Sequence, residues 1–238
     1  MTETSVLLDV VRLVTGISIL SFASYTDMKT RQASNVLWIL MGAIGGILLL
    51  TQYFTTSFDN PYYLLFIPIM IGLFFAFFQL RLIFGGADAK ALMAIAILAP
   101  LEPAIDQFPI WQGSVMPFSW SIFSNSIIMF MFIPLGFLIF NVAKRNIKFP
   151  YAFLGYKTNL EKAREKFVWP LEKIVDGKRK FAYMPKDYDA DDEFEEFGKN
   201  GINEIWVTPK IPFMIPLLIG YIFAFIFGDI LFHIIRSI

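Results

Sequence analysis

The sequence contains no cysteine and only one histidine, His233. The absence of cysteine excludes disulfide bonds, thiol nucleophiles and zinc sites with cysteine ligands. A single histidine excludes a multi-histidine metal site within one chain. We therefore expect no metal and no cofactor, and carboxylates remain as the main candidates for chemistry.

Charged side chains are also scarce, at 17% of the residues against 56% that are apolar, and the formal net charge is zero. Bulk charge therefore indicates neither nucleic-acid binding nor attraction to a membrane surface. Apolar runs of about twenty residues are typical of a membrane protein with several crossings. Residues 1–5 lack the basic region of a removable signal peptide, so the first apolar run is expected to be retained.

The apolar runs lack an alternating pattern, which favours helices, and only helices or closed barrels can cross lipid. Six spans are predicted: Val6–Tyr25, Asn35–Phe54, Tyr62–Phe78, Ala89–Leu101, Trp120–Val142 and Ile211–Ile235. The fourth is short for a crossing, so it is either half-buried or completed by part of Leu101–Phe118. The expected fold is an all-α polytopic membrane protein of six transmembrane helices, with a small mixed α/β cytoplasmic domain inserted before the last helix.

Lysine and arginine are absent from two of the loops, Thr51–Asn60 and Leu101–Phe118. Basic residues gather instead around the turns that follow the first, third and fifth spans: Lys29, Arg31, Arg81, Lys90, Lys144, Arg145 and Lys148. Because basic loops stay in the cytoplasm, this pattern predicts a multi-pass plasma-membrane protein with both termini outside.

The largest polar region lies between the last two spans and is cytoplasmic on this topology. Three parts are expected: residues 1–143 with transmembrane helices 1–5 and the catalytic loops, 144–210 as the soluble domain, and 211–238 as transmembrane helix 6. A soluble domain of this size has a thin core of its own.

Local signals predict several elements inside the soluble domain. A capping-box pattern at Thr158 predicts a helix that runs to Val168. Asp176-Gly177 predicts a turn between short strands, and Ile205–Thr208 is predicted to form a strand. The acidic run Asp187–Glu196 is interpreted either as a solvated loop or as a surface that attracts a basic peptide.

Two aspartates, Asp27 and Asp88, lie on the inner side, each at a junction between a span and a short loop. Asp9 and Asp229 lie towards the outer ends of spans, near basic residues, and are expected to form structural ion pairs. Two neighbouring carboxylates cannot easily both ionise, so one holds a proton while the other stays charged. Such a pair is equipped to activate water and to protonate a leaving amine.

The aspartates alone leave more than one function open. An endopeptidase would use them as an acid–base pair, whereas a small proton- or ion-coupled transporter would use them as a relay. The transporter predicts further polar groups through to the outer side, and the spans contain few: Thr15, Ser18, Ser21, Ser24, Asn125 and Asn141. A third alternative is a non-catalytic membrane scaffold whose cytoplasmic domain serves as a docking surface.

The segments around both aspartates carry a more specific pattern. In Tyr25–Asn35 an aspartate is followed by basic residues and then by a small residue before asparagine, and in Gly85–Lys90 an aspartate follows a glycine-containing turn. This pattern resembles the GxGD-type aspartic proteases of the type IV prepilin peptidase family, and within it the archaeal preflagellin (prearchaellin) peptidases. Ala87 stands where the GxGD signature has glycine, a looser form that the preflagellin peptidases resemble.

The resemblance implies that Asp27 and Asp88 are the catalytic pair of an aspartic endopeptidase at the cytoplasmic face. The substrate would be a preflagellin (archaellin) with a short basic leader, cut before a hydrophobic helix. Gly85, Gly86 and Ala87 would let the scissile segment lie extended against the turn. Membrane lipids are the other expected partners, and nucleic acid is not expected. No methyltransferase activity is expected either, because the cysteine-containing segment of the bacterial relatives is missing.

Overall fold

A computed structural model of the chain describes residues 3–56, 58, 61–83, 85–175, 177–182 and 190–237. The chain divides into two units. The helical unit comprises Met1–Phe130 and Pro212–Ile238, and the mixed unit comprises Met131–Ile211.

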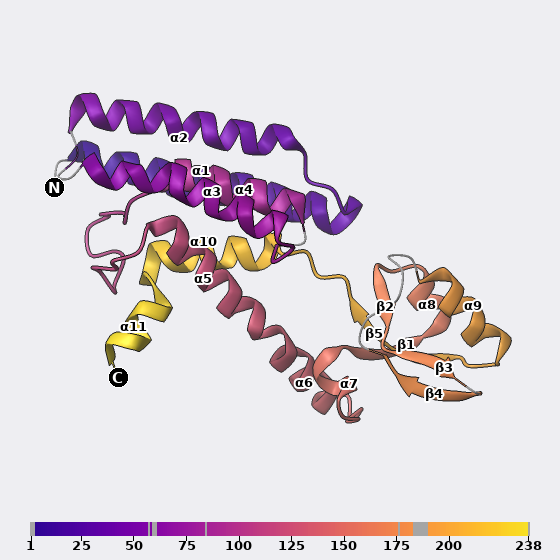
Figure 1. Cartoon of the computed structure of the whole chain (residues 1–238). Coiled ribbons are helices and arrows are strands. Elements are labelled where there is room, and N and C mark those ends of the chain that lie inside the picture. Colours follow the sequence, from indigo (N-terminus) through magenta and orange to yellow (C-terminus); the bar gives the residue numbers. More distant parts are fainter. Residues whose placement is uncertain are drawn as a thin grey trace. The chain divides into compact units, whose positions relative to one another are not determined.

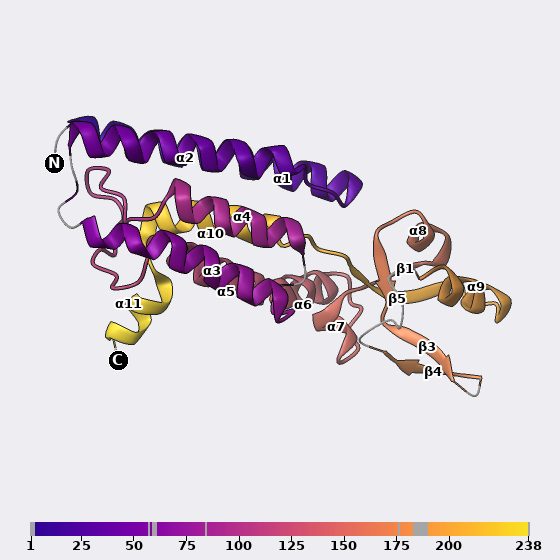
Figure 2. The ribbon, with the colours of Figure 1, turned by 45° about the horizontal axis from the view of Figure 1, so that its top comes forward.

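The helical unit is built from apolar helices, in which every backbone group is bonded within its own segment. They are α1 (Glu3–Thr30), α2 (Asn35–Thr55), the 3-10 helix η1 (Pro61–Leu65), α3 (Phe66–Gln79), α4 (Gly86–Leu98), α5 (Phe118–Met131), α10 (Met214–Phe227) and α11 (Ile230–Ser237) (Figure 1). Helix α4 packs against both α2 and α3, and α1 packs against α10 and α2. Figure 2 shows α3 and α4 side by side.

Four segments of the described chain are long and apolar enough to cross a membrane: Glu3–Thr30, Asn35–Thr55, Pro61–Gln79 and Phe118–Ala143. The last of them runs through α5 into α6 (Ile133–Ala143). With 13 and 14 residues, α4 and α10 are shorter than a usual crossing of about 20 residues. Residues 99–117 contain no helix, so the suggestion that this segment completes the fourth span is wrong.

The last predicted span, Ile211–Ile235, is interrupted between α10 and α11. Gly228 has a φ of +97°, a conformation that favours glycine. A Cβ atom at this position would lie 2.2 Å from the carbonyl oxygen of Trp111. The backbone N–H of Trp111 donates to the carbonyl of Phe227 at 2.8 Å, and the Trp111 ring stacks on His233 of α11 at 4.2 Å. The loop before α5 therefore fixes the point at which α10 ends.

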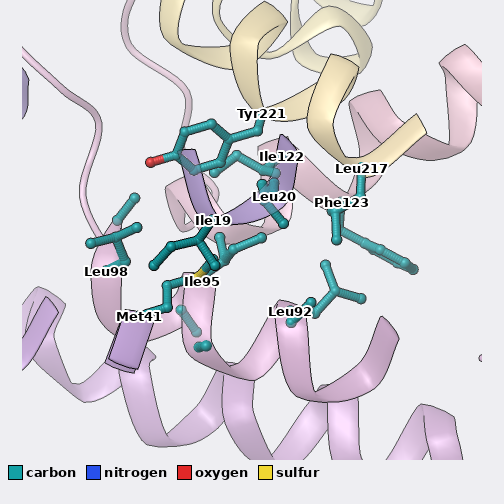
Figure 3. Close-up of a cluster of buried hydrophobic side chains, with 14 of the residues drawn as sticks. Ile19, Leu20, Met41, Leu92, Ile95, Leu98, Ile122, Phe123, Leu217 and Tyr221 are labelled. Atoms are coloured by element: carbon teal, nitrogen blue, oxygen red, sulfur yellow. The ribbon is translucent and has the colours of Figure 1, made fainter. Parts of the chain in front are cut away.

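Helix α4 lies in the core of the helical unit. Its buried residues are Ala89, Ala91, Leu92, Ala94, Ile95, Ala96 and Leu98. Figure 3 shows Leu92, Ile95 and Leu98 clustered with side chains of α1, α2, α5 and α10. Helix α4 is therefore surrounded by other helices of the unit over most of its length. This packing holds the first turn of α4, which carries Asp88, in a defined place.

Glycines allow the helices around α4 to approach closely. A Cβ atom on Gly45 of α2 would lie 2.6 Å from the Cα of Leu98, and one on Gly16 of α1 would lie 2.2 Å from the ring of Tyr221. Small residues permit this kind of backbone contact between membrane helices. The spacing of α2 from α4, and of α1 from α10, is therefore set by the absence of a side chain.

A buried ion pair joins the elements near the start of α1. Arg12 Nη1 donates to Asp9 Oδ1 at 2.6 Å, and Arg12 Nη2 donates to Gln52 of α2 at 2.7 Å. The second oxygen of Asp9 accepts the backbone N–H of Ala104, in the loop after α4, at 2.9 Å. The ion pair predicted for Asp9 is confirmed, and neither buried charge lacks a partner.

The ion pair predicted for Asp229 is wrong. Within the described ranges, its carboxylate accepts hydrogen bonds from the hydroxyls of Ser121 at 2.8 Å and Ser114 at 3.2 Å. It also accepts the backbone N–H of Phe232 at 2.9 Å, so it caps the first turn of α11. Hydrogen-bond donors from distant parts of the chain thus take the place of a neighbouring cation.

The mixed unit contains the strands. Its elements are α6, α7 (Tyr151–Leu154), β1 (Tyr156–Asn159), α8 (Leu160–Arg164), β2 (Val168–Pro170), β3 (Glu172–Val175), β4 (Lys178–Phe181), α9 (Asp191–Lys199) and β5 (Glu204–Pro209). Strands β1, β5 and β2 form an antiparallel sheet in that order, and β3 pairs with β4 as a hairpin. The core beside the sheet includes Leu160, Val168, Phe194, Phe197, Ile205 and Val207.

The helix predicted from Thr158 to Val168 has the wrong bounds. Thr158 lies in β1 opposite Ile205, and the helix cap is Asn159, whose side chain accepts the N–H of Glu161 at 2.9 Å. Helix α8 then ends at Arg164, and β2 begins at Val168. Pairing with β5 thus outweighs the local helix signal.

The turn and strand predictions hold in the described residues, whereas the interpretation of the acidic run as a loop is wrong from Asp191 onward. Of the predicted turn, Gly177, at φ +71°, lies between β3 and β4, and Asp176 lies outside the described residues. The strand at Ile205–Thr208 forms the centre of β5. The acidic run enters α9 at Asp191, and the buried Phe194 and Phe197 anchor this helix. Residues 187–189 of the run lie outside the described residues.

Candidate functional site

Asp27 lies in the last turn of α1 and is half-buried. The helix ends where Arg31 takes up a left-handed conformation, with φ +56°, and its N–H donates to the Asp27 carbonyl at 3.0 Å. A residue of this conformation directly after the last turn is a common helix terminator. The guanidinium of Arg31 also lies within electrostatic range of the Asp27 carboxylate.

Asp88 is the third residue of α4, where a negative charge is favoured by the helix dipole. Gly85 is the N-cap, in an extended conformation, and Gly86 begins the helix. The Asp88 side chain folds back over this turn, because a Cβ atom on Gly85 would lie 2.1 Å from Asp88 Oδ2. The absence of a side chain at Gly85 therefore gives the carboxylate its place.

The structure brings the two aspartates together. Asp27 and Asp88 lie close enough for their negative charges to repel each other, although they come from α1 and α4 and stand far apart in the sequence. Carboxylates in this relation favour a state in which one is protonated and the other is charged. Two carboxylates in such a state can serve as a proton acceptor and a proton donor.

Lys90 and Asn35 form a hydrogen bond beside the pair. Lys90 Nζ, two residues after Asp88, donates to Asn35 Oδ1 at 2.8 Å. Asn35 is not the cap of α2, because Ser34 is the N-cap and its hydroxyl accepts the N–H of Val36. Asn35 is thereby free to link the starts of α2 and α4. A polar residue at the first position of an apolar span was the available sequence signal for this contact.

This link predicts a modest effect on the endopeptidase activity that the family resemblance implies. Asn35→Leu and Lys90→Met are each expected to lower kcat about two- to fivefold, because loss of an exposed hydrogen bond lets the first turn of α4 shift. The double variant is expected to lose no more than either single variant, which initial rates of all four proteins will show. Additive losses would contradict a direct link between the two side chains.

The glycine turn borders a hollow at the end of α3. A hollow of about 540 Å³ is lined by Phe78, Gln79, Arg81 and Ile83. Phe78 also lies beside the turn, because a Cβ atom on Gly86 would lie 3.7 Å from its ring. Pockets of this size suit a few side chains of a peptide.

The described residues contain no group of three histidine, cysteine, aspartate or glutamate side chains that could hold a metal ion. The two aspartates combine nearby carboxylates with an adjacent glycine turn. What this arrangement can do without an additional group is general acid–base chemistry on water.

The chain is similar to known peptidases. A model of the type IV leader peptidase family matches residues 14–141, and a model described as archaeal peptidase A24 C-terminus type II matches residues 147–230. A preflagellin peptidase of Methanocaldococcus jannaschii is 27% identical over 96% of this chain and 98% of its own length. Preflagellin peptidases of Methanococcus maripaludis (29% identity; 88% and 92%) and Methanococcus voltae (26%; 92% and 96%) are also similar.

The first family match takes in more than half of the chain and both aspartates. The helices described above are long and apolar enough for a membrane protein. Together these findings identify a membrane protease, and the chain belongs to the type IV leader peptidase family.

Proposed function

We propose that this protein is an aspartic endopeptidase that removes the basic leader of preflagellins at the cytoplasmic face of the plasma membrane. The observation that carries the proposal is the approach of Asp27 and Asp88, from separate helices, at the end of the bundle that also bears Lys29, Arg31 and Lys90. The names of the three relatives support preflagellins as the substrates.

In the proposed mechanism the charged aspartate takes a proton from water, which attacks the scissile carbonyl. The protonated aspartate donates a hydrogen bond to the carbonyl oxygen and then supplies a proton to the leaving amine. Gly85, Gly86 and Ala87 form the turn against which an extended substrate segment lies. An extended segment is needed because a helix shields its own carbonyl groups.

The proposed topology follows from the ends of the helices. Asp27 and Asp88 lie near basic turns, whereas Asp9 and its partners lie at the other end of α1. We place the basic end in the cytoplasm, with six crossings, both termini outside and residues 144–210 as the cytoplasmic domain. The short helices α4 and α10 would then cross the membrane surrounded by the other helices of the unit. A leader that stays in the cytoplasm is cut at the same interface.

Two of the six polar residues named for a transporter path, Asn125 and Asn141, already hold backbone carbonyls. Asn125 donates to the Gly228 carbonyl at 2.8 Å, and Asn141 donates to the carbonyls of Ala152 at 3.0 Å and Gly155 at 2.7 Å. These side chains satisfy breaks in the helical backbone. A relay needs polar groups that are available to a moving ion.

The function is tested with the full-length protein in lipid vesicles and a purified preflagellin. We expect a single cut directly before the hydrophobic helix, identified by mass spectrometry of both products. A preflagellin whose basic leader residues are replaced by glutamine serves as the matched substrate and is expected to be cut about tenfold more slowly. No cleavage by the wild-type protein, or proton flux through the vesicles in its place, would overturn the proposal.

A further inference from the structure

The mixed unit contains a buried carboxylate that the aspartate pair does not use. Glu172, the first residue of β3, is 1% exposed. Its Oε2 accepts hydrogen bonds from Arg179 and from the backbone N–H of Trp206, at 3.3 Å for the latter. Its Oε1 is buried and accepts no hydrogen bond from any residue in the described ranges. Buried carboxylate oxygens are nearly always hydrogen-bonded, so this atom marks a position for a donor.

Lys148 lies near Glu172 Oε1 but does not form a hydrogen bond with it. Its Nζ is 3.9 Å from Glu172 Oε1, which is an ion-pair distance but too long for a hydrogen bond. The same ammonium lies 4.6 Å from the centre of the Tyr151 ring, in the range of a cation–π contact. The Lys148 side chain is 58% exposed, so it can leave this place at little cost.

The aromatic side of the position is rigid. The Tyr151 ring is buried between Phe181, at 5.1 Å and 85°, and Trp206, at 5.5 Å. Burial raises the pKa of Tyr151, and the negative charge of Glu172 raises it further, so the phenol stays neutral. A fixed aromatic face next to a carboxylate is the arrangement that binds an ammonium or guanidinium group.

The fold does not depend on Lys148 to balance the charge of Glu172. In the β3–β4 hairpin Glu172 pairs with Phe181 and Ile174 pairs with Arg179, which puts Arg179 on the same face as Glu172. Arg179 already forms an ion pair with the carboxylate. Lys148 is therefore a second cation, and another cation that forms the missing hydrogen bond would bind in its place.

We propose that Glu172 and Tyr151 form a binding site for a basic side chain of the leader peptide, and that Lys148 occupies this site when no substrate is bound. The ligand is a primary ammonium or guanidinium group carried by a peptide. Exchange of one cation for another leaves the charge of the site unchanged, and the new donor satisfies Oε1. This inference rests on the proposed function for the identity of the peptide.

The test measures binding rather than cleavage, so its outcome does not depend on the aspartate pair. The full-length protein in detergent is titrated calorimetrically with a peptide of leader length that carries two lysines, and with its norleucine counterpart. Lys148→Ala is expected to bind the lysine peptide about fivefold more tightly, because the internal competitor is gone, and Glu172→Gln about tenfold more weakly. Lys173→Ala is the matched control, since Lys173 is exposed and adjacent to Glu172 on the opposite face of β3.

The sign of the Lys148 effect decides the inference. If Lys148 has only a structural role, Lys148→Ala will bind the lysine peptide as tightly as the wild-type protein or more weakly. If Lys148→Ala binds this peptide no more tightly than Lys173→Ala does, the proposed site is overturned. This arm remains decisive even if Glu172→Gln fails to fold. The norleucine peptide is expected to bind all variants alike. Ethanolamine is titrated as a separate ligand that stands for a lipid headgroup. If Lys148→Ala binds ethanolamine more tightly than the wild-type protein does, but does not bind the lysine peptide more tightly, the site is assigned to a lipid headgroup and the leader assignment is overturned.

Discussion

Asp27→Asn and Asp88→Asn are each expected to lower the rate of leader cleavage by about 10³-fold or more, while the protein still accumulates in the membrane. Asparagine keeps the volume of the side chain but can neither take up nor release a proton near neutral pH. Each half of an acid–base pair is needed, so the double variant is expected to be no slower than either single variant. The measurement is the initial rate of leader release from a preflagellin in vesicles.

Asp106→Asn provides the matched control for these variants. Asp106 is an exposed carboxylate in the loop after α4, and its φ of +52° suits asparagine as well as aspartate. The loop follows the end of α4 that lies away from Asp88, so activity within about twofold of wild type is expected. If either site variant keeps more than a tenth of the wild-type rate, the two-carboxylate mechanism fails and the transporter alternative gains weight.

The elements that carry the site were accessible from the sequence because their signals are local. The uniform apolar runs before Asp27 and after Asp88 predict helices, and both residues stand at the ends of those runs. The glycine turn at Gly85 indicates a loosened backbone directly before the acid. The family resemblance then indicates that the segments with Asp27 and Asp88 belong to one site, which no local signal can show.

The parts that sequence reasoning missed depend on contacts between distant residues. The helix predicted at Thr158 gives way to a strand because β5 pairs with it, and the last span ends at Gly228 because Trp111 packs there. The link from Lys90 to Asn35 joins residues 55 positions apart. None of these partners can be chosen from local propensity, since propensity is a weak guide where tertiary contacts compete.

The glycine turn gives a second prediction with a large effect. Gly85→Ala is expected to lower kcat about 10- to 100-fold, because the added methyl group would lie 2.1 Å from Asp88 Oδ2 and displace the carboxylate. The backbone need not change, since a φ of −88° and a ψ of 120° are open to alanine. The fall in kcat is therefore expected to come from the displaced Asp88 side chain and not from unfolding. Thermal unfolding of the purified variant will check that the fold is kept.

Gly86→Ala adds the same methyl group one residue later, where its nearest neighbours are ring atoms of Phe78 at 3.7 Å. This is an ordinary contact, and alanine is the better helix former at the start of α4. We expect kcat within about threefold of wild type, and an increase in KM if the substrate lies against this turn. An equal fall of kcat in both variants would show that the turn as a whole must be bare, and that the contact between Gly85 and Asp88 is not what positions the carboxylate. A fall confined to Gly85→Ala would tie the activity to the placement of Asp88, independently of any change in its charge.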